Sequence, residues 1–172
     1  MSSIIIDEIS ANDDRLECSV RSSTDLERFF TDEPFRTSYD VPIEDVPAGV
    51  LAIPVLAQVC PVAWANGADV YVDEVDATFA RALEDVQASL CEMYDFLEGG
   101  TLYARSTIEP EPEPGDESGL LFTGGVDSTC SYVRHREESP TLISIRGWTI
   151  TPDAADDEKW AALLRARLAI RC

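Results

Sequence analysis

The stretch Gly119–Ser131, which reads G-L-L-F-T-G-G-V-D-S-T-C-S, constrains the fold more than any other part of the chain. Its apolar run Leu120–Phe122 predicts a short strand, and the residues from Val126 to about Arg136 have helical character. A turn of small residues, Thr123–Gly125, joins the two. A strand, a small-residue turn and a helix in this order place backbone N–H groups around a space that an anion can occupy. The stretch therefore predicts an α/β unit with an anion site at its turn.

The residues of this turn suit a phosphate group. Gly124 and Gly125 adopt backbone conformations barred to other residues and let a phosphate approach the main chain. The N–H groups near Val126–Ser128 open the predicted helix and add the positive end of its dipole. Asp127 can orient the turn or help to hold Mg²⁺. Three hydroxyl groups can donate to phosphate oxygens, those of Thr123, Ser128 and Thr129. The alternative is a plain turn in which Asp127 or Ser128 caps the helix.

The residues Thr123–Ser128, T-G-G-V-D-S, resemble the S-G-G-x-D-S signature of the PP-loop ATP pyrophosphatases, which are adenine nucleotide alpha-hydrolase-like proteins. Thr123 replaces the first Ser of the signature and keeps its hydroxyl group. This superfamily comprises adenylating amidotransferases and tRNA-thiolating enzymes. Its loop grips the β,γ-phosphates of ATP while a substrate oxygen attacks the α-phosphorus and pyrophosphate leaves. The resemblance implies ATP and Mg as cofactors, a small-molecule or tRNA substrate and, in an active protein, an adenylating ligase or transferase.

A second segment, Thr141–Trp148, resembles the strand that follows the loop helix in PP-loop domains. In those domains, backbone groups at the end of this strand meet the adenine, as expected at the carboxyl ends of parallel strands. The resemblance implies nucleotide contacts at Arg146 and Gly147. Trp148 either packs in the core, which is the more common role, or stacks on the base. Relatives often carry Asp two residues after the glycine, where this chain has Thr149.

The resemblance covers roughly residues 119–170, and PP-loop domains contain more strands than this stretch predicts. Either the segment Asp69–Ile108 supplies the missing strands, or the chain is a fragment or a degenerate copy. We expect the N-terminal part of a PP-loop protein, because the apolar ending Leu168–Cys172 reads like a helix cut short. Two functions stay open: an ATP-dependent adenylating enzyme, or a non-catalytic nucleotide-binding module that needs further chain, a second copy or another protein to complete its sheet.

The N-terminal region predicts a small α+β arrangement. Ser3–Ile9 and Arg15–Arg21 form a β-hairpin by pattern. Thr24–Glu27 matches a capping box and predicts a short helix over Asp25–Phe30. The prolines within Asp32–Pro47 indicate a loop.

The segment Val46–Ala68 has no charged residue and is long enough to span a bilayer. Its internal prolines and acidic flanks instead favour a buried, proline-interrupted helix or helix pair. Asp69–Val75 alternates like a strand, and Asp76–Leu97 has apolar residues at spacings of four and three, typical of an amphipathic helix. We expect Gly99-Gly100 to end that helix and Thr101–Ile108 to form a strand.

These elements define the expected organisation. Residues 1–108 form the N-terminal α+β region, residues 109–118 an acidic, proline-rich connector and residues 119–172 the nucleotide-binding half-domain. A strand over Thr141–Ile145 and a last helix from about Asp153 to about Ile170 complete a parallel α/β pattern. The predicted fold class is α/β, with a parallel Rossmann-like sheet in an incomplete PP-loop domain.

The charge balance narrows the function classes. The chain has 33 acidic and 13 basic residues, a net charge of −20, and Lys159 is its sole lysine. This composition resembles the salt-adapted proteins of haloarchaea and argues against a general nucleic-acid surface, which needs clustered basic residues. The absence of a G-x-x-x-x-G-K-[ST] motif excludes a Walker-type NTPase. His135 lies about 10 Å along the predicted helix from Ser128, beyond hydrogen-bond reach.

The cysteines indicate a reducing compartment. The chain has five cysteines with no C-x-x-C pair and one histidine, so a zinc site of the usual spacing cannot form. Such a dispersed set is typical of reduced thiols in a cytosol. The chain begins without a recognisable targeting segment, and we expect a cytoplasmic protein outside membranes. Cys130 is expected to face the sheet as a small apolar residue.

Overall fold

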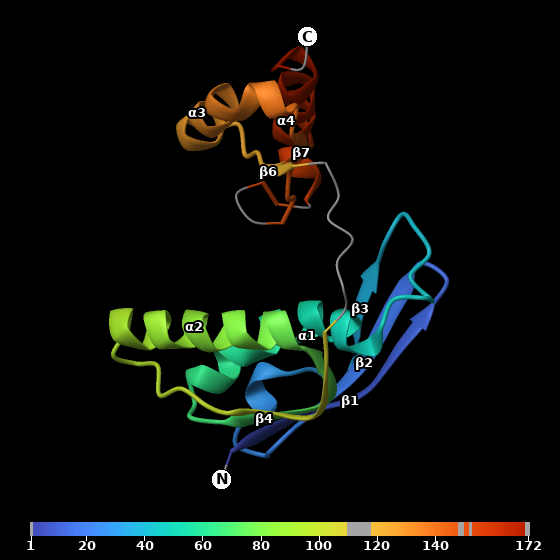
Figure 1. The fold of residues 1–172 in the computed structure, drawn as a ribbon, viewed down its shortest axis with the longest axis vertical. Helices are drawn as coiled ribbons and strands as arrows, with labels where there is room; N and C mark the ends of the chain where they lie inside the picture. The colour runs from blue at the N-terminus through green and yellow to red at the C-terminus, as the bar shows by residue number, and fades with distance from the viewer. Residues whose placement is uncertain (1, 110–117, 148–149, 152, 171–172) are drawn as a thin grey trace. The chain divides into compact units, whose positions relative to one another are not determined.

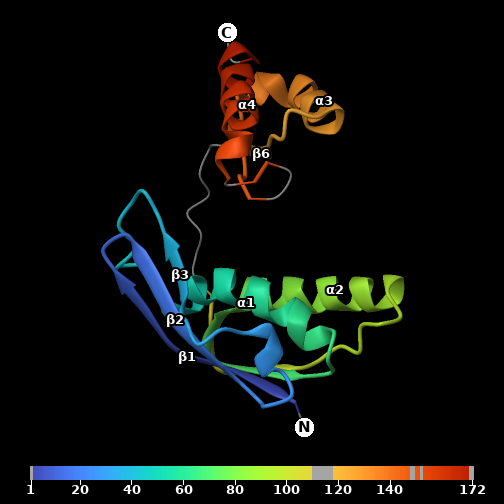
Figure 2. The same cartoon turned by 180° about the vertical axis from the view of Figure 1, so that it is seen from behind.

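The computed structural model describes residues 2–109, 118–147, 150–151 and 153–170. The chain forms two compact units, Met1–Glu111 and Pro112–Cys172 (Figures 1 and 2). The boundary between them falls within residues 109–118, the segment expected to be a connector. Most of this segment lies outside the described residues.

The first unit is built on a five-stranded mixed sheet with the order β3-β2-β1-β4-β5 (Figure 1). β1 pairs antiparallel with β2, as the predicted hairpin requires, and β2 pairs antiparallel with β3. β1 and β4, and then β4 and β5, pair in parallel. The α/β class is therefore confirmed, and this larger sheet is mixed rather than purely parallel. The strands are β1 (Ser3–Asn12), β2 (Arg15–Ser22), β3 (Phe35–Ser38), β4 (Asp69–Asp76) and β5 (Leu102–Ile108).

Two helices, α1 (Ala48–Trp64) and α2 (Ala77–Met93), precede and follow β4. Figures 1 and 2 both show them on the same side of the sheet. The alternation of side chains agrees with this, because Val70 and Val72 are buried while the intervening Tyr71 is exposed. On the uncovered side, Tyr71 stacks on Tyr103 of β5 with ring centroids 5.1 Å apart. One face of the sheet thus carries the core and the other faces outward.

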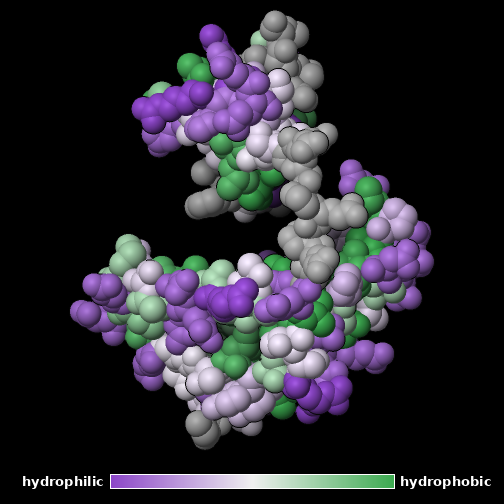
Figure 3. Space-filling model, viewed as in Figure 1, coloured by the Kyte–Doolittle hydropathy of each residue, from purple (hydrophilic) through white to green (hydrophobic). Residues whose placement is uncertain are grey.

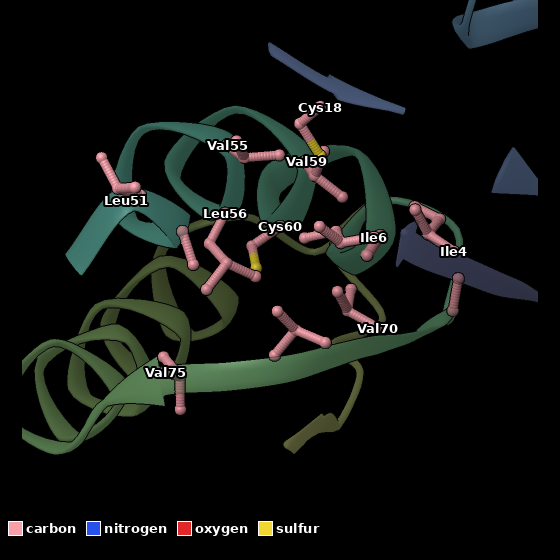
Figure 4. Close-up of a cluster of buried hydrophobic side chains, with 14 of the residues drawn as sticks. Ile4, Ile6, Cys18, Leu51, Val55, Leu56, Val59, Cys60, Val70 and Val75 are labelled. Atoms are coloured by element: carbon pink, nitrogen blue, oxygen red, sulfur yellow. The ribbon is translucent and has the colours of Figure 1, made fainter. Parts of the chain in front are cut away.

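The core of the first unit lies between α1 and the sheet (Figure 4). The uncharged segment was expected to form either one buried helix or a helix pair, and it forms one helix. Both Pro54 and Pro61 lie inside this helix. Pro61 has no N–H group, so the Ala57 carbonyl one turn earlier lacks its helical hydrogen bond. Both residues are exposed, and water can bind that carbonyl instead. Among the described residues, no helix is both long and apolar enough to cross a membrane.

Gly99-Gly100 does not end α2. The helix ends at Met93, and the two glycines precede β5, where the Gly99 N–H donates to the Trp64 carbonyl oxygen over 3.0 Å. A Cβ atom on Gly100 would lie 2.1 Å from the Ala68 carbonyl oxygen. The pair is therefore required by a close approach of two main-chain segments rather than by the end of a helix.

Two further N-terminal expectations hold only in part. The predicted helix over Asp25–Phe30 is only a 3-10 turn, Glu27–Phe29, whose N-cap residue is Leu26 and which has no side-chain cap. The Asp25 carboxylate instead accepts a hydrogen bond from the Ser2 hydroxyl group, which lowers the pKa of Asp25. The segment expected to be a loop contains β3, because four residues after Pro34 can add an edge strand to β2.

The second unit contains a two-stranded parallel sheet of β6 (Gly119–Leu121) and β7 (Thr141–Ile143). α3 (Val126–His135) connects them, followed by a 3-10 turn, Arg136–Glu138, and a second 3-10 turn, Ala154–Asp156, leads into α4 (Asp157–Ile170). Their order and type match the prediction. Phe122, Leu142 and Leu163 form the buried core, against which Leu120, Tyr132, Ile150 and Trp160 pack.

β4 and β5 do not extend this second sheet, so the alternative in which Asp69–Ile108 supplies its missing strands does not hold. The physical reason is the hydrogen-bonding capacity of a strand, which has two edges. β4 pairs with β1 through one edge and with β5 through the other. The strand–helix–strand segment therefore belongs to the first unit.

Candidate functional site

The candidate site is the turn Thr123–Gly125 with the first residues of α3. Phe122, directly before the turn, is buried in the core of the second unit. Its N–H donates to the Ile143 carbonyl oxygen over 2.7 Å, and its carbonyl oxygen accepts from the Ser144 hydroxyl group over 2.6 Å. Both polar groups of its main chain are thus bonded to β7 and the residue that follows it. The turn consequently starts from a fixed point at the carboxyl end of the sheet.

Gly124 gives the turn its shape. Its φ angle is +76°, in the left-handed region that favours glycine. A Cβ atom at this position would also lie 2.9 Å from Cδ1 of Leu163, a core residue of α4. The backbone conformation therefore favours glycine here, and a Cβ atom would in addition require the end of the Leu163 side chain to shift.

The hydroxyl groups predicted to contact phosphate come together. Thr123 Oγ1 and Ser128 Oγ lie 3.3 Å apart across the turn, and Ser128 Oγ donates to the Gly125 carbonyl oxygen over 3.1 Å. Thr123 and Asp127 are exposed, as are Gly124, Gly125 and Val126, whereas Ser128 and Thr129 are half-buried. The residues predicted from Thr123 to Thr129 therefore form one accessible turn.

α3 begins without a capping side chain from its N-cap residue. That residue is Gly125. The plain-turn alternative required Asp127 or Ser128 to cap the helix, and neither residue is at the N-cap position. An N-cap Ser, Thr, Asp or Asn would place a side-chain oxygen on the first N–H groups of the helix. Glycine leaves this space to another acceptor, and the positive end of the helix dipole favours an anionic one. The start of α3 therefore leaves room for an acceptor from outside the helix.

The second predicted contact region follows β7. The Arg146 guanidinium group donates to the carbonyl oxygens of Thr151 and Asp153 over 3.0 and 3.2 Å and to Asp157 Oδ1 over 2.5 Å. The group is thus bound within the segment that joins β7 to α4, which makes Arg146 an organiser of that segment. Gly147 has a φ angle of +124°, and a Cβ atom on it would have no neighbour within 4 Å. Its N–H donates to the Ile150 carbonyl oxygen over 2.8 Å. Trp148 and Thr149 lie outside the described residues.

Asp156 is a residue that the sequence analysis missed. Its carboxylate accepts hydrogen bonds from Lys159 Nζ over 2.5 Å and from both the N–H and the hydroxyl group of Thr151 over 3.0 Å. The bond from Lys159, followed by those from Thr151, lowers the pKa of Asp156 to about 2. The available signal was the spacing of Asp156 and Lys159 by three residues at a helix start.

Cys130 and His135 lie on α3 beyond the turn. Cys130 is exposed, so the expectation that it faces the sheet was wrong. Tyr132 packs on the core, and two residues of a helix turn the side chain by about 200°, which sends Cys130 to the opposite side. His135 Nδ1 lies 2.8 Å from Glu138 Oε1 within the following turn. This contact is local and agrees with a structural role for the histidine.

The turn offers one carboxylate for a cation. Among the residues that the structure describes, no group of three or more His, Cys, Asp or Glu side chains is placed to hold a metal ion. Mg²⁺ commonly uses one or two carboxylates, with phosphate oxygens and water in its remaining positions. Asp127, exposed beside the turn, fits this limited role.

The first unit has a hollow of about 630 Å³ where β1 and β4 diverge after Ile5 and Tyr71. Its polar groups bind one another or the main chain: Asp7 pairs with Arg21, Asp73 with Arg105, and Glu74 accepts from the Gly49 N–H over 3.0 Å. Acidic side chains outnumber basic ones in its lining, which disfavours a phosphate. The turn of the second unit suits an anion better.

Comparison with known proteins gives no match for this chain, whether with protein-family models, with curated proteins or with solved structures.

Proposed function

We propose that the second unit binds the polyphosphate chain of Mg-ATP at Thr123–Ser128. The observation that carries the proposal is the exposed turn in which Gly124 is left-handed, the N-cap is a glycine and two hydroxyl groups lie 3.3 Å apart. Each property favours an anion held by main-chain N–H groups. The similarity of the T-G-G-V-D-S sequence to the PP-loop signature is the ground for choosing ATP as the anion.

Each residue then has a distinct part. The N–H groups at Val126–Ser128 bind the β,γ-phosphates, assisted by the hydroxyl groups of Thr123, Ser128 and Thr129. Asp127 binds Mg²⁺ together with phosphate oxygens. Arg146 positions the segment after β7, in which the missing side chain of Gly147 leaves room for the adenine.

The reaction that such a site supports is adenylation of a small molecule or a tRNA, in which a substrate oxygen attacks the α-phosphorus and pyrophosphate leaves. The loop residues would hold the leaving group, and Mg²⁺ held at Asp127 would supply neutralisation of its charge. The free cysteines, of which Cys18 and Cys60 are buried, fit a cytoplasmic protein. ATP pyrophosphatase-type activity is thus the first candidate function.

A second candidate is a nucleotide-binding module completed by further chain or by a partner. The observation in its favour is the outward face of the β6–β7 sheet, on which Leu121 is 61% exposed and Ile143, its neighbour in register, is 47% exposed. Parallel sheets normally have both faces covered. Completion of this sheet would precede any turnover in the second candidate.

Binding is tested by titrating the full chain with Mg-ATP in molar KCl, with Ser128→Ala and its matched control Ser131→Ala. Both serines are half-buried on α3, and Ser128, unlike Ser131, belongs to the candidate site through its contact with Thr123. Loss of one hydrogen bond to a charged phosphate should weaken binding by about tenfold in Ser128→Ala. The control should bind like the natural chain. Equal affinities for the two variants, or no heat with the natural chain, would refute the proposed site.

Cys130 supplies a second measurement that does not depend on turnover. It is exposed on the second turn of α3, and its alkylation should slow when Mg-ATP occupies the turn. Release of pyrophosphate on addition of candidate substrates then separates the two candidates. Protection without pyrophosphate supports the binding module, whereas both together support the enzyme.

A further inference from the structure

α2 has an apolar strip that the first unit leaves uncovered. None of the residues of this helix is buried. Its apolar side chains recur at spacings of four and three, which is the heptad pattern of a helix that packs against another helix. Leu83 and Leu90 are half-buried against the core of the unit. Val86, which lies between these two leucines in the sequence, is 48% exposed, and Met93, which follows them, is 68% exposed.

The exposed side chains lie along one line of the helix. Successive residues turn by about 100°, so Val86 and Met93, seven apart, differ by only about 20° in direction. Ala82 and Ser89, both exposed, lie beside them on the side away from the core. Small side chains there permit a second helix to approach closely. We call Ala82, Val86, Ser89 and Met93 the α2 strip.

The charges beside the strip differ between the two ends of the helix. Arg81, the sole basic residue of α2, lies near the start, and Glu92 lies near the end on the same flank. A second α2 helix in antiparallel orientation, with Arg81 opposite Glu92 of the second copy, forms this pair twice. The same alignment sets Asp85 opposite the uncharged Ala88. The contacts that Arg81 makes in one chain, 3.7 Å to the exposed Glu109 and 3.4 Å to the Thr78 hydroxyl group, are both long and exposed, so they can exchange at little cost.

We propose that two copies of this chain pair antiparallel through the α2 strip. The arrangement is isologous, since one two-fold axis places the same strip of both copies in contact and both Arg81–Glu92 pairs form together. This reciprocity of a single helix face points to a second copy as the occupant. Hydrophobic residues reach the visible surface elsewhere in both units (Figure 3), but the α2 strip combines heptad spacing with self-complementary charge.

Sedimentation analysis of the full chain over a micromolar to millimolar range tests the pairing, with Val86→Glu and Val41→Glu as a matched pair. Val41, in a loop of the first unit, is 56% exposed, close to the exposure of Val86. A carboxylate desolvated in the interface should raise the dimer dissociation constant at least about tenfold in Val86→Glu. Val41→Glu should leave it unchanged. Circular dichroism checks that both variants are folded.

A charge exchange gives a second, independent measurement. Arg81→Glu and Glu92→Arg should each weaken the dimer, and the double variant should restore it. The double variant has the same net charge as the natural chain. Glu92→Arg alone lowers the net negative charge, which by itself favours association, so a weaker dimer in this variant reports the local pair.

Two outcomes overturn the proposal. One is a monomer at every concentration in both dilute and molar KCl, the latter screening the repulsion between two chains of charge −20. The other is a dimer that Val86→Glu and the two single charge variants leave unchanged, because such a dimer would use another surface.

Discussion

Close main-chain contacts fix the identity of several residues in this fold. A Cβ atom on Gly49, at the start of α1, would lie 2.9 Å from the main-chain carbon of Val75 in β4. A Cβ atom on Gly100 would lie 2.1 Å from the Ala68 carbonyl oxygen. In both places the atom that would have to move belongs to the main chain, which yields less readily than a side chain.

Gly100→Ala should therefore destabilise the chain by about 2 kcal/mol or more, since the new methyl group forces two backbone segments apart. The free energy of unfolding, from denaturant titration followed by circular dichroism, measures the loss. Gly119→Ala is the control, because its Cβ atom would meet only the flexible end of Ile143, at 3.2 Å. A Gly100→Ala chain as stable as the control would show that this contact is looser than described.

Asp156 makes the stability of the second unit depend on pH in the acidic range. Its pKa, lowered from 3.8 to about 2 by Lys159 and Thr151, means that the folded state favours the carboxylate. The resulting stabilisation is fully present above the ordinary pKa and is lost as the pH falls toward 2. Asp156→Asn removes it. The difference in unfolding midpoint between the natural chain and this variant should shrink between pH 4 and pH 2, and a constant difference would contradict the assigned bonds.

At the scale of elements, carboxylates at the end of β4 begin both helices of the first unit. Glu74 accepts the Gly49 N–H near the start of α1, a helix with no acidic residue of its own in the first turn. Asp76 is the N-cap of α2 and accepts the Phe79 N–H over 2.6 Å. Negative groups at helix starts satisfy free N–H groups and complement the helix dipole. The strand thus fixes where each helix begins.

Asp76→Ala should cost about 1 kcal/mol of unfolding free energy, the usual loss for an N-cap carboxylate. Asp73→Ala, on the same strand, removes only an exposed ion pair with Arg105 and should cost much less. Thermal unfolding of the two variants side by side gives the comparison. Equal losses would mean that the cap contributes nothing beyond a surface charge.

At the scale of the whole molecule, repulsion among acidic groups opposes folding. The net charge is −20, and the ion pairs described are mostly between exposed side chains, such as Arg36 with Glu17. Exposed pairs contribute little to stability. Their number therefore does not offset the repulsion, and screening by salt must supply part of the stability.

The unfolding midpoint should accordingly rise from about 0.1 M to about 1 M KCl, over which the screening length falls from about 10 to about 3 Å. An uncharged osmolyte at equal osmolality is the control, since it stabilises by exclusion without screening. A midpoint indifferent to KCl, or one raised equally by the osmolyte, would show that charge repulsion is not what limits stability.

The sequence by itself determined the local elements. Alternation and heptad spacing located β4 and α2, and the run Gly119–Ser131 predicted a strand, a turn and a helix that the structure contains. The turn residues from Thr123 to Thr129 were predictable because they are neighbours in the chain. Periodicity and glycine placement act over one element, so one sequence suffices to detect them.

Tertiary structure alone decided which strands pair and which side chains face inward. β4 joined β1, from which it is distant in sequence, instead of the strands of the second unit, and β3 formed only because an edge of β2 was free. Arg146 binds Asp157, and Cys130 faces outward. Both orientations depend on neighbours that tertiary structure brings close. Pairing and burial depend on contacts between distant segments, and local pattern carries no record of them.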